Sequence, residues 1–247
     1  MPGLPITGER TVPGVGHENY WFRRHLVVYD ALAPRCRGVV LEAGCGEGYG
    51  ADLLAEGATV LALDYDAQAI GHVGRRYPAV SAARANLVAL PVRDGVVDAV
   101  VSLQVIEHLW DQAGFLRECR RVLAPGGALL LSTPNRITFS PGRDTPLNPF
   151  HTRELAAAEL VELLVAAGFG DVAVRGLHHG PRLCALDAAH GGSFIAAQTA
   201  AALTREWPAA LIRDVAAVTT ADFALHPDGP DHPVDASLDL VATATVP

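Results

Sequence analysis

Residues 39–50 have the sequence VVLEAGCGEGYG, in which an apolar run ends at Glu42 and a glycine-rich turn follows. The next residues, 51–56, have the composition of a helix. The order strand, glycine turn, helix is how α/β sheets build nucleotide pockets, because glycines let the backbone approach a ligand and adopt φ values that side chains forbid. The stretch therefore predicts an α/β sheet with a nucleotide-like ligand at the turn.

The spacing of the glycines distinguishes this turn from two other nucleotide-binding motifs. Gly44, Gly46 and Gly48 give G-x-G-x-G, whereas a dinucleotide fingerprint needs its third glycine where Tyr49 stands. No Lys-Ser or Lys-Thr pair follows the turn, which excludes a P-loop. The next apolar run ends in Asp64, whose carboxylate can accept hydrogen bonds from both hydroxyls of a ribose. A tight structural turn would explain the glycines alone, but not this combination.

The motif E-x-G-C-G-x-G with Asp64 resembles the class I S-adenosylmethionine-dependent methyltransferases. Two further segments resemble the same family: D-x-V-x-S-x-x-V-x-E-H-L at 98–109, and a helix, Pro-Gly-Gly turn and apolar strand at 115–135. The resemblance covers roughly residues 18–175. It implies a Rossmann-like α/β fold with a mostly parallel seven-stranded sheet, helices on both faces, an N-terminal lid helix and a C-terminal helical insertion. It also implies S-adenosyl-L-methionine as the cofactor.

The resemblance implies contacts to each part of the cofactor. Gln104 is a candidate for the methionine part, and the side-chain carbonyl of Asn86 for the adenine amine, unless Asn86 only forms a turn. The predicted helix at 17–33 either packs as an ordinary helix or forms a lid, in which Arg23 or Arg24 pairs with the cofactor carboxylate. The predicted cofactor-binding residues are Tyr20, Trp21, Arg24, Glu42, Gly44, Gly46, Gly48, Asp64, Tyr65, Asn86, Leu87 and Gln104.

The long irregular segment 135–151 is expected to bind the methyl acceptor, since loops of this length in compact domains are often functional. His151 ends it, just before a helix for which Thr152 is the predicted N-cap. We expect His151 to take the proton of an acceptor hydroxyl, because a hydroxyl is a poor nucleophile without a base. Ordering the loop is its alternative role. His108 is a second candidate base, or a histidine that only caps or packs, and Arg136, Asp144 and His151 are candidates for holding the substrate.

Composition sets further limits. The chain has 247 residues, half of them hydrophobic, which predicts one domain: an arm and lid helix at 1–34, a core at 35–177, and an insertion with the last strands at 178–247. A net charge of −8 argues against nucleic acid as the substrate. No apolar run is long enough to span a membrane, and no secretory signal is visible. The four cysteines lack metal-ligand spacing and are expected to be free thiols in a reducing compartment. A cytoplasmic protein is therefore expected.

The two ends of the chain carry further predictions. Residues 1–16 are rich in Pro and Gly and are predicted to form a mobile arm. The insertion at 178–220 should contain two helices, near 193–204 and 208–217, and form a substrate wall or the surface of a homodimer. His178 and His179 lack carboxylate or Cys partners at ligand spacing, so no metal site is predicted, although the need for a divalent ion stays open.

A closer resemblance spans nearly the whole chain. The segments G-E-R-T-V-P (8–13), H-E-N-Y-W-F-R-R-H (17–25), N-P-F-H-T-R-E-L (148–155) and H-G-P-R-L (179–183) are similar to methyltransferases of mycobacterial polymethylated-polysaccharide loci. This implies O-methylation of sugar hydroxyls in a precursor of methylglucose lipopolysaccharide, with an oligosaccharide or other small molecule as acceptor. The alternatives are O-methylation of a small aromatic or lipid-like hydroxyl such as a quinol, and a non-catalytic protein that binds S-adenosylmethionine.

Overall fold

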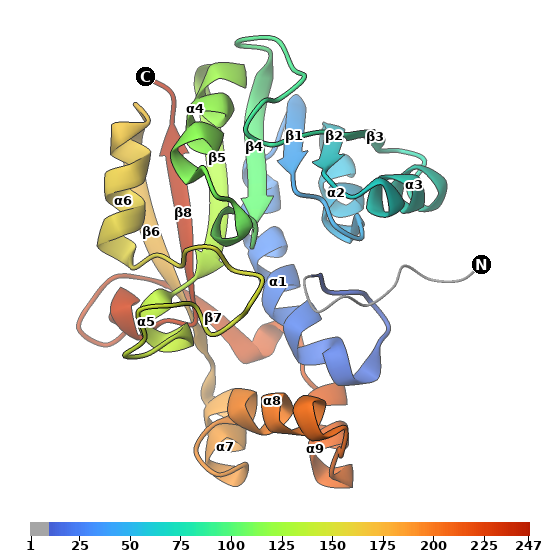
Figure 1. Ribbon diagram of the computed structural model, residues 1–247, viewed down its shortest axis with the longest axis vertical. Coiled ribbons are helices and arrows are strands. Elements are labelled where there is room, and N and C mark those ends of the chain that lie inside the picture. The colour runs from blue at the N-terminus through green and yellow to red at the C-terminus, as the bar shows by residue number, and fades with distance from the viewer. Residues whose placement is uncertain (1–9) are drawn as a thin grey trace.

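The computed structural model describes residues 10–247, and residues 1–9 of the predicted arm lie outside this range. A single eight-stranded sheet with the order β3-β2-β1-β4-β5-β8-β6-β7 runs through the molecule (Figure 1). The first five strands in this order are parallel, and the last three pair in antiparallel fashion. The strands are β1 (Val39–Ala43), β2 (Thr59–Asp64), β3 (Ser81–Arg84), β4 (Val97–Leu103), β5 (Leu123–Pro134), β6 (Gly170–His179), β7 (Phe223–Pro227) and β8 (Asp239–Thr245).

The predicted fold class is confirmed, but the predicted number of seven strands is wrong. The segment Phe223–Pro227 pairs with β6 at the edge of the sheet and adds the eighth strand. Pairing at an edge satisfies the free backbone groups of β6 on its outer side. The strand lies outside the parallel half of the sheet, so it does not change the edge at which a ligand is expected.

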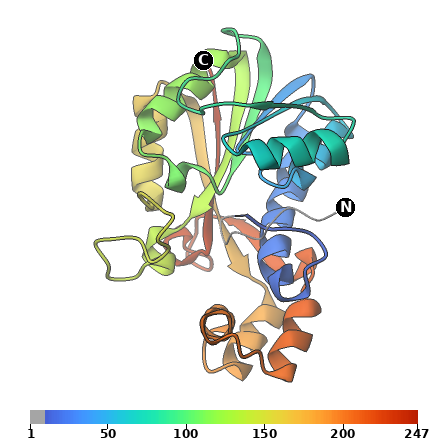
Figure 2. The same cartoon turned by 45° about the vertical axis from the view of Figure 1, so that its right-hand side comes forward.

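Helices cover both faces of the sheet (Figures 1 and 2). One buried cluster joins the sheet to α1 (Asn19–Leu32), α2 (Tyr49–Ala55) and α3 (Ala67–Arg76), and a second joins it to α4 (Gln112–Val122) and α6 (Ala157–Ala166). On β5, Leu130 belongs to the first cluster, whereas Leu129 and Leu131 belong to the second. This alternation is what a strand buried on both faces requires.

The insertion between β6 and β7 forms three helices at one end of the molecule (Figure 1): α7 (Pro181–Ala189), α8 (Phe194–Thr204) and α9 (Ala209–Ala216). The last two match the predicted helices, whereas α7 was not predicted, because the Gly-Pro pair at its start is also typical of a turn. The insertion is attached to α1. Nδ2 of Asn19 donates to three carbonyls at the end of α9, over 2.9 to 3.2 Å.

The N-terminal segment is packed against the core where the structure describes it. Arg10 forms an ion pair of 2.6 Å with Asp66, and the Thr11 hydroxyl lies 2.8 Å from the Tyr49 hydroxyl. Thr11 is only 9% exposed. The prediction of a mobile arm is therefore wrong for these residues. No helix within residues 10–247 has both the length and the apolarity needed to cross a bilayer.

Candidate active site

The glycine turn after β1 has the backbone shape that its sequence predicted. Gly44, Gly46 and Gly48 have φ values of 89°, 53° and 97°, in the left-handed region that favours glycine. A Cβ atom on Gly48 would lie 2.6 Å from Cγ2 of Val73, so a side chain there would collide with α3. The turn is held by Asp64, whose carboxylate accepts from the backbone N–H of Gly46 at 2.9 Å. The predicted ribose-binding carboxylate thus lies directly beside the turn.

Glu42, at the end of β1, is 1% exposed. The Tyr29 hydroxyl donates to its Oε1 atom at 2.6 Å, while Oε2 is buried and has no hydrogen-bond partner among residues 10–247. Burial raises the pKa of Glu42 to about 8. A buried carboxylate oxygen that lacks a partner is costly, so this atom is suited to a donor group on a ligand bound at the turn.

Arg24 lies on α1 and is also buried, at 3% exposure. Its guanidinium donates two hydrogen bonds of 2.7 Å to the Asp239 carboxylate and one of 3.0 Å to the Leu238 carbonyl. Asp239 is the first residue of β8 and Leu238 precedes it, and neither partner was predicted. Nη1 has no hydrogen-bond partner in the described part of the chain, so one donor of Arg24 remains for a ligand carboxylate. The lid interpretation of α1 therefore rests on one nitrogen of Arg24.

Tyr20 is fully buried beneath the insertion. Its hydroxyl lies 2.7 Å from Nε2 of His179, and Nδ1 of that histidine lies 2.7 Å from the Asp187 carboxylate. The ring packs edge-on against Phe194. The structure thus places Tyr20 between the ends of β6 and β7 and helix α8, with its hydroxyl at hydrogen-bond distance from His179. Trp21 is half-buried and lies edge-on to Tyr20, under the guanidinium of Arg24.

Three of the predicted cofactor-binding residues follow the ends of β2 and β3: Tyr65, Asn86 and Leu87. Tyr65 is 74% exposed, and the Arg84 guanidinium lies 5.2 Å from its ring centre. Oδ1 of Asn86 accepts from the backbone N–H of Val88 at 3.1 Å, so the turn-forming role of Asn86 is present in the structure. Leu87 is buried beside it. A contact between Asn86 and adenine stays a prediction.

Gln104 ends β4 with a left-handed backbone, at a φ of 57°. Such a conformation costs a non-glycine residue about 1–3 kcal/mol, and it persists where the surroundings impose it. Here the Gln104 backbone N–H donates to the Ser132 carbonyl at 2.9 Å, and its side-chain amide lies 3.2 Å from the Ser132 hydroxyl. The sharp turn sends the chain into a short 3-10 helix, Ile106–His108, which carries two further polar side chains.

The loop at 135–155 is tied to that short helix by Thr152. Its backbone N–H donates to the Glu107 carbonyl at 2.7 Å, and its hydroxyl donates to the Leu109 carbonyl at 2.8 Å. Thr152 therefore does not cap the next helix as predicted. The N-cap of α6 is Ala156 instead. This attachment brings His151 beside His108, with ring centres 4.9 Å apart.

His151 is held on both ring nitrogens. Nδ1 lies 2.7 Å from Oε1 of Glu154, and Nε2 lies 3.0 Å from Nδ2 of Asn148. Oδ1 of Asn148 accepts from the Phe150 N–H, which leaves Nδ2 as the group that donates to His151. Nδ1 therefore faces an acceptor and Nε2 faces a donor, which favours the tautomer with its proton on Nδ1 and its lone pair on Nε2. Sequence reasoning missed Glu154, although it follows His151 by three residues.

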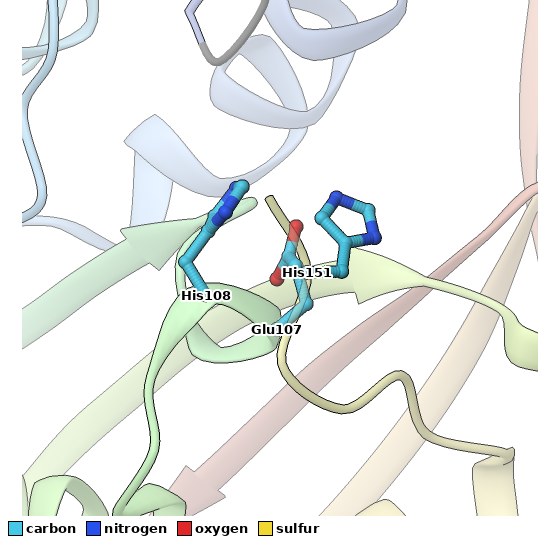
Figure 3. A group of neighbouring side chains, drawn as sticks. All are labelled: Glu107, His108 and His151. Carbon is cyan, nitrogen blue, oxygen red and sulfur yellow. The ribbon is translucent and has the colours of Figure 1, made fainter. Parts of the chain in front are cut away.

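Glu107 completes the cluster shown in Figure 3, in which its carboxylate and the two imidazole rings face one another. It is 1% exposed, and its Oε2 atom accepts from the Thr133 hydroxyl at 3.0 Å. Burial raises the pKa of Glu107 to about 8. Nδ1 of His108 lies 3.0 Å from the Phe150 carbonyl. The structure thus brings together both candidate bases, with a carboxylate that the prediction did not include.

A cavity of about 290 Å³ opens beside this cluster. Ionic and hydroxyl groups dominate its wall, and Arg136 within it pairs with Glu159 at 3.1 Å. Glu154 connects the cavity to His151. A larger cavity, of about 620 Å³, lies at the opposite edge of the sheet near Gly95 and contains no predicted site residue. The smaller cavity is lined by Arg136, Ser140, Arg143, Asp144, Thr145, Pro146, Thr152, Arg153, Glu154 and Glu159.

Comparisons with known proteins agree with this geometry. A methyltransferase-domain family model matches residues 41–131. A Mycobacterium tuberculosis protein described as a probable S-adenosylmethionine-dependent methyltransferase is 62% identical over 99% of this chain and 90% of its own length. A ubiquinone biosynthesis O-methyltransferase from Methylocella silvestris is 37% identical over 48% of this chain and 49% of its own.

The fold is also similar to solved structures. A Thermotoga maritima S-adenosylmethionine-dependent methyltransferase, described as a possible histamine N-methyltransferase, superposes with a TM-score of 0.62. The superposition covers 92% of this chain and 93% of that one, at 18% sequence identity. At this identity the similarity establishes the fold alone.

Proposed function

Because the chain belongs to the class I S-adenosylmethionine-dependent methyltransferases, we propose that it is an O-methyltransferase of sugar hydroxyls. Its acceptor would be a precursor of a polymethylated polysaccharide such as methylglucose lipopolysaccharide. The observation that carries this proposal is the wall of the 290 Å³ cavity, in which Pro146 is the one apolar lining residue. Arginine and carboxylate side chains are suited to the hydroxyls of a sugar, whereas an apolar pocket would suit an aromatic or lipid-like acceptor.

S-adenosyl-L-methionine supplies an electrophilic methyl group on a sulfonium. We assign its ribose to Asp64, which lies beside the glycine turn. The unpartnered atoms Oε2 of Glu42 and Nη1 of Arg24 fit the amino and carboxylate groups of its methionine part. Tyr65, Asn86 and Leu87 are assigned to the adenine side, and Gln104 to the methionine side. The charge and the solvent exposure of each residue in the structure support these assignments.

His151 is proposed as the general base. Its Nδ1–H is held by Glu154, so Nε2 offers a lone pair to the proton of an acceptor hydroxyl. The acceptor has to displace the amide of Asn148, which now donates to that nitrogen. Arg136 and Asp144 line the cavity and are proposed to hold neighbouring hydroxyls. Alignment of the hydroxyl with the methyl group then supplies much of the rate.

Two alternatives to a sugar acceptor remain. The partial similarity to ubiquinone biosynthesis O-methyltransferases favours a quinol or related phenol as the second candidate acceptor. A protein that binds S-adenosylmethionine without transferring its methyl group would show affinity for the cofactor but no turnover.

The proposal also includes a cytoplasmic location, a single domain, and a substrate wall or dimer surface on α7–α9.

The test is transfer of labelled methyl from S-adenosylmethionine to a panel of α-glucan and mannan oligosaccharides, with phenols and quinols beside them. Label on an α-glucan is the expected result, and its position would identify the methylated hydroxyl. Label only on the aromatic compounds would replace the sugar acceptor with the second candidate. Binding of the cofactor without label on any compound would contradict transfer to either class.

A further inference from the structure

We propose that Glu107, His108 and His151 form a binding site for one divalent transition-metal ion, next to the proposed acceptor cavity that Glu154 links to His151. Each residue offers a ligand atom, and these atoms all lie within 4.8 Å of one another. Figure 3 shows the carboxylate and the two rings converging from the short helix after β4 and from the loop that ends at His151. Pairs of ligand atoms on one ion are separated by about 3–4 Å, as expected for metal–ligand bonds of about 2.0–2.2 Å, so a small movement closes the site.

The histidines are oriented in the way that metal-binding histidines require. Nδ1 of His108 lies 3.0 Å from the Phe150 carbonyl, and Nδ1 of His151 lies 2.7 Å from the Glu154 carboxylate. A carbonyl and a carboxylate only accept hydrogen bonds, so each Nδ1 carries the proton and each Nε2 carries the lone pair. A carbonyl or carboxylate behind each histidine is the usual support for a metal ligand. An ion would replace the Asn148 amide at Nε2 of His151.

The carboxylates give independent support. Glu107 and Glu154 are 1% and 3% exposed, and within residues 10–247 neither forms an ion pair with an Arg or Lys side chain. Oε2 of Glu154 is buried and has no hydrogen-bond partner in the described part of the chain. Two carboxylates buried this deeply normally face positive charge. One divalent ion between Glu107 and the two histidines would provide it.

The ligand set selects the type of ion. Two imidazole nitrogens and one carboxylate oxygen suit Zn²⁺, Mn²⁺, Fe²⁺ or Co²⁺, whereas Mg²⁺ and Ca²⁺ prefer oxygen ligands. Three protein ligands leave coordination positions open, as catalytic metal sites do. This chemistry differs from the sequence-based expectation of no metal site, because the ligands come from segments more than 40 residues apart and show no local spacing.

The role of the ion rests on the proposed function. An acceptor hydroxyl bound to an open position would lose its proton to water, because the ion lowers the hydroxyl pKa, and the resulting oxygen anion is the nucleophile. Nε2 of His151 then holds the ion and does not take the proton. His151 therefore acts as a base in the metal-free protein and as a ligand in the loaded one.

Metal binding is measured directly on the full-length protein after treatment with a chelator. Titration with Zn²⁺ followed by calorimetry, and Co²⁺ followed by its visible absorption, should each give one ion per chain. We expect Glu107→Gln, His108→Asn and His151→Asn each to weaken binding more than tenfold, and Glu154→Gln to weaken it by about 10–100-fold. Circular dichroism and thermal unfolding check that each variant folds.

His232→Asn is the matched control, because His232 belongs to a separate group of histidines with His178 and His226. Loss of binding in His232→Asn, with binding retained in His108→Asn, would overturn the proposed site, as would absence of one-to-one binding. Methyl transfer is recorded separately for the chelated and loaded protein. Binding without transfer to any acceptor contradicts the proposed function alone, and transfer by a protein that binds no ion contradicts this inference alone.

Discussion

Oε1 of Glu154 lies 2.7 Å from Nδ1 of His151, and both side chains are almost fully buried. The carboxylate fixes the tautomer and the orientation of the ring, as the acidic partner does in other histidine dyads. Nε2, the atom proposed to take the proton, faces the Asn148 amide at 3.0 Å. A proton acceptor placed this way needs one amide to move before it can reach an acceptor hydroxyl.

Glu154→Gln keeps the shape of the side chain but removes the charge that orients His151. We expect kcat in the chelated protein to fall by about 10–100-fold, and His151→Ala to lower it by about 10²–10⁴-fold. The dissociation constant for S-adenosylmethionine should not change, because neither residue lies at the glycine turn. Initial rates measure kcat, and calorimetry measures the dissociation constant.

The control is His226→Ala, on β7, which should leave kcat unaltered. A wild-type kcat in His151→Ala would show that His151 is not the base.

Glu42 should make stability depend on pH. Its pKa is raised from 4.5 to about 8 in the folded protein. Between these values the folded state keeps a proton that the unfolded state has released, so the unfolding free energy falls as pH rises, by up to about 1.4 kcal/mol per pH unit. Glu42→Gln should reduce this slope in urea unfolding between about pH 5 and pH 8, and Glu107, whose pKa is also raised to about 8, should account for the slope that remains. Equal slopes in variant and wild type would show that Glu42 titrates normally.

Asp239→Asn should destabilise the protein strongly, because it leaves the buried guanidinium of Arg24 without its charge partner. We expect a loss of about 3–5 kcal/mol in the unfolding free energy. Asp94→Asn is the comparison, since Asp94 pairs with Arg121 at an exposed position and should contribute less than about 1 kcal/mol. Urea unfolding of both variants at neutral pH measures the difference. Similar losses would mean that burial of the Arg24 pair has no effect.

Gly48→Ala tests the backbone of the glycine turn. The position has a φ of 97°, and the added methyl group would lie 2.6 Å from Val73. We expect a loss of about 1–3 kcal/mol in stability and weaker binding of S-adenosylmethionine. Gly74→Ala, inside α3 with open space around it, should instead raise stability by about 0.5–1 kcal/mol. Thermal unfolding and cofactor titration compare the two, and a neutral Gly48→Ala would contradict a required left-handed turn.

The parallel half of the fold was predictable because its signals are local. The apolar runs at 39–43 and 97–103 form β1 and β4, and the glycine turn has the predicted backbone. The carboxyl ends of these strands meet at one edge, so Asp64 lies where the motif indicated. Periodicity and glycine spacing are sufficient for such features.

The rest depends on contacts between distant segments, which a sequence pattern does not contain. The pairs Arg24–Asp239 and Tyr20–His179 join residues more than 150 positions apart. For this reason the sequence left open whether the helix at 17–33 is an ordinary packed helix or a cofactor lid, and it did not indicate the partners of this helix on β8 and at the end of β6. His108 and His151 were both predicted as candidate bases, but their proximity, and the carboxylate of Glu107 beside them, required the tertiary structure.

The attachment of α1 to the insertion has a consequence for protein engineering. Asn19 donates to carbonyls at the end of α9, and the Tyr20 ring packs against Phe194 of α8, although most of the chain lies between α1 and these helices. A chimaera that exchanged α7–α9 with those of a relative would keep the contact between Tyr20 and His179, because His179 belongs to β6, but it would change the surface against which the Tyr20 ring and the Asn19 amide pack. We therefore expect that α7–α9 can be exchanged between relatives without loss of stability only when α1 is exchanged with them.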